Sequence, residues 1–238
     1  ALPICFELLD NMPHDRVVFG RDYAQPAMTL LEHDADHRVL GECLEPLPAG
    51  SDLGRLFALW REFDAEGRPP ADDFGLILAA RERLRGAWFG LQRLLRKRQT
   101  AVYLPTHLFR CVEALRGWPG ADLLLSDFCW LPFDRRLRAG VEELNPPLIS
   151  TQTADGHRDF ASLAEPPFGT ADVFFPTDFA FLQQLLARVL GRQARVESPA
   201  EFFAQWAEPD WCATRTGFNP LREDFINTKY LSTAPVGR

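Results

Sequence analysis

The chain has 238 residues, of which 46% are hydrophobic and 25% charged, and its formal net charge is −7. Its apolar surface, which includes 19 Phe and 6 Trp, excludes an intrinsically disordered chain and predicts a globular one. No apolar run approaches the roughly 18 residues that a membrane-spanning helix needs, so we expect no membrane span. The acidic balance also gives no electrostatic reason to expect nucleic acid as a partner.

The first part of the chain predicts short strands followed by helices. Apolar runs bounded by polar residues or proline indicate strands at residues 2–9, 16–19 and 39–44. The polar residues 32–37 match the turn of a hairpin between strands. From Ser51, a good N-cap, apolar residues recur at helical spacing, and we therefore expect a helical insertion at residues 51–100.

The following part predicts an α/β sheet. A strand at residues 101–104 and a helix at residues 105–115 lead through a Gly/Pro-rich turn into a strongly apolar strand that ends at Asp127. Helix, turn, buried strand and terminal acid are typical of a sheet with parallel strands. Later segments predict strands at residues 148–153, 173–175 and 194–197. They also predict a helix at residues 179–190, capped by Asp178, and a helix from Pro199, where Ser198 and Glu201 match a capping box. The tail after Thr214 is expected to be irregular, with helical character only at residues 220–230.

A basic segment opposes the acidic balance of the chain. Residues 81–98 contain six Arg and one Lys against one Glu, which is a local charge of +6. Apolar residues at helical spacing accompany these charges, and this pattern favours a solvated helix face. A surface that docks a partner protein or contacts RNA is the alternative interpretation.

Motifs for metal ions, phosphate groups and hydrolysis are absent from the sequence. The five cysteines include no Cys-x-x-Cys pair and predict free thiols in a reducing compartment. His33 and His37 fall in an acidic turn, so we expect no metal site. The 16 Gly include no Gly-x-Gly pair, so no dinucleotide fingerprint or phosphate loop lies within these residues. Asn145 and the two prolines after it are interpreted as a rigid loop.

The end of the first predicted strand and the loop after it have the composition of a ligand site. Glu7 and Asp10 bring two carboxylates and Asn11 brings an amide, and Pro13 and His14 follow directly. In open α/β sheets, ligands bind at the carboxyl ends of the strands. Composition alone supports a ligand site and an ordinary polar junction equally.

Residues 7–13, Glu-Leu-Leu-Asp-Asn-Met-Pro, resemble the signature of the MidA-like methyltransferases. That family uses S-adenosylmethionine (SAM) and includes the mitochondrial arginine methyltransferase that assists assembly of respiratory complex I. Three further stretches are similar to family segments in the same order: Leu-Pro-Thr at 104–106, Leu-Leu-Leu-Ser-Asp-Phe at 123–128, and Thr-Ala-Asp-Val-Phe-Phe-Pro-Thr-Asp-Phe at 170–179. The last of these, like residues 217–231, most resembles a fungal-type branch of the family.

The resemblance implies an α/β chain with a partial Rossmann-like SAM-dependent methyltransferase fold that holds the second half of the sheet. Residues 1–238 are then the C-terminal part of a single methyltransferase domain, and the SAM-binding N-terminal half is expected before residue 1. The implied cofactor is SAM, the implied partner is a protein substrate such as a complex I core subunit, and the implied location is mitochondrial. No role for nucleic acid is implied.

Glu7 and Asp10 are the expected catalytic residues, because methyl transfer to an arginine needs carboxylates that orient the guanidinium group. Asn11, Pro13 and His14 are expected to shape the same loop. Asp127 is expected to contact substrate, to orient a helix or to be a buried structural acid.

A second hypothesis follows from departures from the family pattern. Phe6 replaces the family's Asn, Asn11 its Ala, and Phe128-Cys129 its Tyr-Gly. These changes keep open a non-catalytic assembly or binding module derived from a methyltransferase, in which the basic segment docks an acidic partner.

Overall fold

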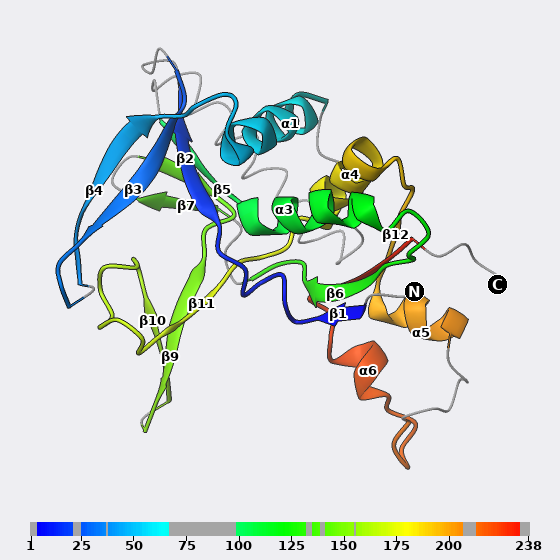
Figure 1. Ribbon diagram of the computed structural model, residues 1–238. Coiled ribbons are helices and arrows are strands. Elements are labelled where there is room, and N and C mark those ends of the chain that lie inside the picture. Colours follow the sequence, from blue (N-terminus) through cyan, green and yellow to red (C-terminus); the bar gives the residue numbers. More distant parts are fainter. Residues whose placement is uncertain are drawn as a thin grey trace. The chain divides into compact units, whose positions relative to one another are not determined.

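In the computed structural model, the chain forms two compact units, each built from segments that are distant in sequence (Figure 1). The first unit comprises Ala1–Pro13, Pro105–Asp134 and Pro147–Arg238, and the second comprises His14–Leu104 and Arg135–Pro146. The structure describes residues 4–20, 25–36, 38–66, 99–131, 135–138, 141–154, 156–206 and 213–233. The assignment of the whole chain to one methyltransferase domain stays a prediction.

The first unit is organised by a four-stranded sheet. Its strand order is β1 (Ile4–Phe6), β6 (Leu124–Phe128), β13 (Thr228–Ser232) and β12 (Arg195–Glu197). β1 and β6 are parallel, whereas β13 runs antiparallel to both β6 and β12. β1 and β12 are therefore the two edges of this sheet.

Helices cover the two faces of this sheet because its side chains alternate between them. Helices α3 (Thr106–Ala114) and α4 (Phe179–Leu190) lie along one face of the sheet (Figure 1), and Leu231 of β13 is fully buried. Tyr230, one residue earlier, points to the opposite face, where its ring stacks on Phe202 of α5 (Pro199–Trp206) with centroids 4.2 Å apart. A strand displays successive side chains on opposite faces, so β13 contributes to both apolar layers.

Shorter elements complete the first unit. A 3-10 turn, Leu115–Gly117, follows α3, and α6 (Pro220–Glu223) precedes β13. A three-stranded antiparallel sheet has β9 (Leu148–Thr153) between β10 (Gly156–Phe160) and β11 (Asp172–Phe174).

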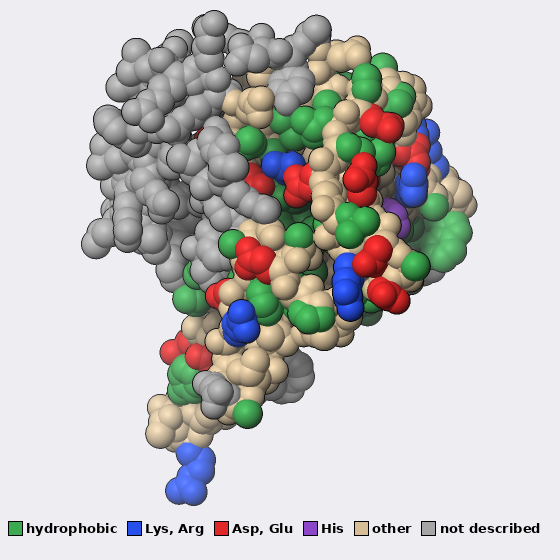
Figure 2. Space-filling view, turned by 90° about the vertical axis from the view of Figure 1, so that its left-hand side faces the viewer, with side chains coloured by type: hydrophobic (Ala, Val, Ile, Leu, Met, Phe, Trp, Pro, Cys, Tyr) green, Lys and Arg blue, Asp and Glu red, His purple; other side chains and the backbone are tan. Residues whose placement is uncertain are grey.

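The second unit contains a six-stranded sheet. Its order is β4 (Val39–Pro46), β3 (Ala27–His33), β2 (Asp15–Phe19), β5 (Thr100–Leu104), β8 (Val141–Leu144) and β7 (Arg135–Arg138), and only β5 and β8 are parallel. Helix α1 (Asp52–Glu66) supplies an aromatic cluster in which Phe57 and Trp60 both lie against Phe19. Figure 2 shows acidic side chains scattered among apolar ones on the face that it presents.

Most predicted elements are confirmed, and so are their local capping signals. The Ser51 hydroxyl accepts a hydrogen bond from the Gly54 amide (3.0 Å), and Asp178 caps α4 by accepting from the Phe181 amide (3.0 Å). Ser198 and Glu201 form a capping box at the start of α5, as Glu201 accepts from the Ser198 amide (2.7 Å). The predicted basic helix lies outside the described residues.

The prediction for the tail was confirmed for a helix that starts at Pro220 and wrong for the residues that follow it. The helix there ends at Glu223, and Thr228–Ser232 forms β13 in the interior of the four-stranded sheet. A five-residue strand has little local signal, and this one is stabilised by neighbours more than 30 residues away in sequence.

In the described part of the chain, no helix combines the length and apolarity that a membrane span needs.

Gly54 is required by a close backbone approach at the start of α1. A Cβ at this position would collide with the carbonyl oxygen of Pro48 and lie 2.9 Å from that of Ala49. We expect Gly54→Ala to lower the free energy of unfolding by about 2 kcal/mol, because backbone atoms must move. At Gly50 a Cβ meets nothing within 4 Å, so Gly50→Ala is the matched control and should change stability by less than about 0.5 kcal/mol. Equal urea midpoints for the two variants would contradict this account.

Candidate functional site

The candidate site lies at the carboxyl ends of the parallel strands β1 and β6, where β1 ends at Phe6 and β6 continues to Phe128. Phe6 pairs with Ser126, and the Glu7 amide donates to the Ser126 carbonyl (3.0 Å), so the next residues of the two strands, Glu7 and Asp127, meet at one edge. Ligand crevices of open α/β sheets form at this edge, because the strands end there and their loops diverge.

Asp127 holds the loop that follows β1. One carboxylate oxygen, Oδ2, accepts hydrogen bonds from the amides of Leu9 (2.7 Å) and Asp10 (3.1 Å), and Oδ1 accepts from the amide of Phe128 (2.7 Å). The side chain is buried, and burial raises its pKa, while these three amides act in the opposite direction. With both oxygens engaged by backbone amides, Asp127 positions the loop.

Asp10 is a buried carboxyl group in a negative environment. Only 1% of its surface is exposed, and burial, followed by the nearby Asp127 carboxylate, raises its pKa from 3.8 to about 6. The Asn11 side-chain amide donates to Asp10 Oδ1 (2.7 Å) and opposes this rise. Asp10 therefore changes its protonation state near pH 6, which suits a group that takes up or releases a proton during a reaction.

Glu7 completes the cluster in a strained conformation. Its φ of 48° lies in the left-handed region, which costs a non-glycine residue about 1 kcal/mol or more. Its backbone carbonyl accepts from the Asn11 side chain (3.4 Å), and its exposed side chain raises the pKa of both Asp10 and Asp127. We refer to Glu7, Asp10 and Asp127 as the acidic cluster.

No cationic side chain of the described residues forms an ion pair with the acidic cluster. Three carboxylates that repel one another favour binding of a positively charged group, since its arrival removes the repulsion. Across the same described ranges, no group of three or more His, Cys, Asp or Glu has an arrangement that could hold a metal ion. The arrangement is chemically suited to an organic cation.

The structure brings together four of the six residues predicted for the site: Glu7, Asp10, Asn11 and Asp127. Pro13, the next residue but one after Asn11, is exposed, and His14 is the first residue of the second unit. His37, considered above as a metal ligand, lies outside the described residues.

A third segment, which the sequence did not assign to the site, anchors both loops. The Phe175 amide donates to the carbonyl of Asp10 (2.8 Å), and the Thr177 amide donates to the carbonyl of Phe128 (2.9 Å). Pro176 lies between these two donors, and its ring fixes the φ angle at this position. In the sequence, the Phe-Phe-Pro-Thr pattern indicated only a resemblance to a family. It could not predict the role of this segment in the site, because its contacts are with residues more than 40 positions away.

The fold, now described, is similar to that of one solved structure in particular. This protein, from Burkholderia thailandensis, is described as a COG1565 superfamily member and "likely methyl transferase" and is bound to S-adenosyl-homocysteine. The match has a TM-score of 0.52 and 11% sequence identity and covers all of this chain. No family model matches the sequence, and no curated protein matches it.

This likeness confirms the predicted fold class, a mixed α/β chain with a methyltransferase-type sheet. At 11% identity it is a likeness of fold alone. The chain spans 54% of the length of the Burkholderia protein.

Proposed function

We propose that the protein is a SAM-dependent methyltransferase that modifies an arginine side chain of another protein. The observation that carries the proposal is the acidic cluster, with two buried carboxyl groups and no cationic partner among the described residues, at the carboxyl ends of parallel strands. The fold likeness to a protein bound to S-adenosyl-homocysteine supports the same class of reaction.

The residues of the cluster fit the cationic substrate of such a reaction. SAM, when bound, supplies a methyl group on a positively charged sulfur. Glu7 and Asp10 hold the guanidinium group of the substrate and orient one nitrogen for attack on the methyl carbon. With SAM bound, the methyl group would pass from sulfur, which would keep the bonding electrons, to this nitrogen, which would lose one proton. Asp10, with a pKa near neutrality, accepts that proton and passes it to water.

The finer parts of the proposal rest on the resemblance to the MidA-like family, including its fungal-type branch. They are that the substrate is a complex I core subunit, that the protein acts in mitochondria and that the modification assists assembly. The altered residues Phe6 and Phe128 favour the second candidate, an assembly module that has lost catalysis.

The test uses the protein expressed from its complete coding region. Calorimetry measures SAM binding, and mass spectrometry compares methylarginine on complex I subunits from cells with and without the gene. We expect SAM binding and at least one methylarginine that disappears with the gene. SAM binding with no such change would support the assembly module, and absence of SAM binding would refute the methyltransferase.

A further inference from the structure

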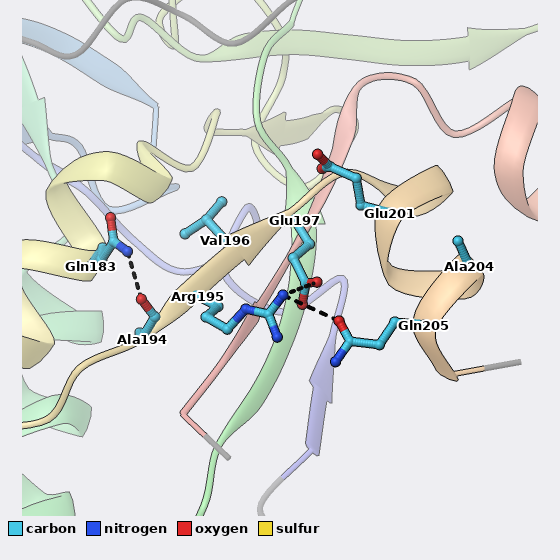
Figure 3. A pocket seen from close by; sticks show the side chains of 8 residues that line it. All are labelled: Gln183, Ala194, Arg195, Val196, Glu197, Glu201, Ala204 and Gln205. Atoms are coloured by element: carbon cyan, nitrogen blue, oxygen red, sulfur yellow. Dashed lines mark hydrogen bonds and ion pairs between the residues drawn. The ribbon is translucent and has the colours of Figure 1, made fainter. Parts of the chain in front are cut away.

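The edge strand β12 lies at the floor of an open groove that is separate from the acidic cluster. The groove has a volume of about 610 Å³ and is lined by Gln183 of α4, by Ala194 and the three residues of β12, and by Glu201, Ala204 and Gln205 of α5. Figure 3 shows α4 on one side of β12 and α5 on the other. The strand is paired with β13 on one side only, within the described part of the sheet.

Glu197 places an unused acceptor in this groove. Its side chain is only 7% exposed, and Oε1 accepts from the Arg195 guanidinium (2.9 Å), whereas Oε2 is buried and has no hydrogen-bond partner. A buried carboxylate oxygen without a partner is costly, and native structures retain few of them. An incoming hydrogen-bond donor would remove that cost.

The surrounding side chains fix the carboxylate and leave Oε2 without a donor. Arg195 also donates to Gln205 Oε1 (3.2 Å), so the guanidinium is held between strand and helix. Glu201 is engaged by Ser198, and Gln183 donates to the Ala194 carbonyl (2.6 Å). Glu197, which lines the groove, therefore keeps one buried acceptor without a donor, and a positively charged nitrogen is the donor that pairs most strongly with a carboxylate.

We propose that this groove binds an extended peptide of a partner protein, which adds to β12 as a strand and places a Lys or Arg nitrogen on Glu197 Oε2. A free strand edge offers a row of backbone donors and acceptors, which a peptide uses for affinity while a side-chain contact gives specificity. Charged side chains, including inward-pointing ones, often blunt such edges, but that role does not require a buried oxygen without a partner, which Glu197 has in Oε2. The site is independent of the proposed methyl transfer.

The test measures peptide binding to the complete protein without SAM. The probe is a fluorescent, capped hexapeptide library with arginine fixed at the third position and the other positions randomised, and a second library has norleucine in place of arginine. We expect the arginine library to bind at least about tenfold more tightly, which is the value of one charge-assisted hydrogen bond. Hydrogen exchange at residues 195–197 should slow when the arginine library binds.

Glu197→Gln should remove the preference for arginine without changing the circular dichroism spectrum, because the amide oxygen still accepts from Arg195. The matched control is Glu45→Gln, the same chemical change at an exposed position on β4. The proposal fails if neither library binds at about 1 mM, or if Glu197→Gln leaves the preference intact. Strand addition would be overturned if capped arginine alone bound as tightly as the arginine hexapeptide library. It would also be overturned if the library left the rate of hydrogen exchange at residues 195–197 unchanged. Loss of methyl transfer would not affect these readouts.

Discussion

Replacement of Asp10 by asparagine is expected to lower the rate of methyl transfer at least about a hundredfold, because the variant can neither balance the guanidinium charge nor accept its proton. The amide keeps the shape of the side chain, and its oxygen can still accept from Asn11, as Asp10 Oδ1 does at 2.7 Å. The loop should therefore keep its structure. The measurement is kcat and KM for the complete protein with its protein substrate across pH 5 to 9.

The dependence of the activity on pH tests the same assignment. The pKa of Asp10 is about 6, so wild-type activity should fall as the pH drops below 6 and the carboxylate takes up a proton. In Asp10→Asn the residual rate should not show this acidic limb. Asp122→Asn is the matched control, since it removes one carboxylate that lies outside the cluster in the same unit. Unchanged turnover in Asp10→Asn would refute the catalytic role of Asp10.

The same variant should be more stable than wild type at neutral pH. An acid whose pKa rises from 3.8 when unfolded to about 6 when folded stabilises the fold only while it is protonated, so its contribution is lost as pH rises through 6. At pH 7 this ionisation costs the wild type about 2 to 3 kcal/mol, since each tenfold change in proton affinity is worth about 1.4 kcal/mol. Urea unfolding at pH 4 and pH 7 checks the difference. Equal midpoints for the two proteins at pH 7 would contradict it.

Replacement of Asp127 by alanine is expected to give the largest loss of stability, about 3 kcal/mol. Three backbone amides, those of Leu9, Asp10 and Phe128, lose their acceptor, and the first two belong to buried residues. An unsatisfied buried donor costs about 1 to 3 kcal/mol, which exceeds the gain from removing a buried carboxylate. The free energy of unfolding in urea measures the effect.

Asp127→Asn separates the hydrogen bonds of this residue from its charge. The amide oxygen can keep the Leu9 and Asp10 amides, so we expect a smaller loss of about 1 to 2 kcal/mol. The neighbouring Asp127 carboxylate raises the pKa of Asp10, so its removal should lower that pKa and shift the acidic limb of activity to lower pH. A limb that stays at the wild-type pH would show that the two carboxyl groups are not coupled. Asp122→Asn should move neither the limb nor the unfolding midpoint.

The local features of this chain could be predicted from the sequence. Ser51, Asp178 and the pair Ser198 and Glu201 cap helices where the pattern placed them, because a cap depends on residues three or four positions apart. The strand β6, which carries Asp127 near its end, was likewise visible as an apolar run followed by an acid, and the two carboxylates after β1 were visible in the same way. Composition alone gave even support to a site and to an ordinary junction.

Only the tertiary structure decided what these residues do. The hydrogen bond from the Leu9 amide to Asp127 joins positions 118 residues apart, and it shows that this acid holds the loop after β1. The placement of β13 inside the sheet and of Glu197 in a groove depends in the same way on strands distant in sequence. Capping and apolar periodicity act within a few residues along the chain, whereas burial and strand pairing are determined by whichever distant segments fold against them.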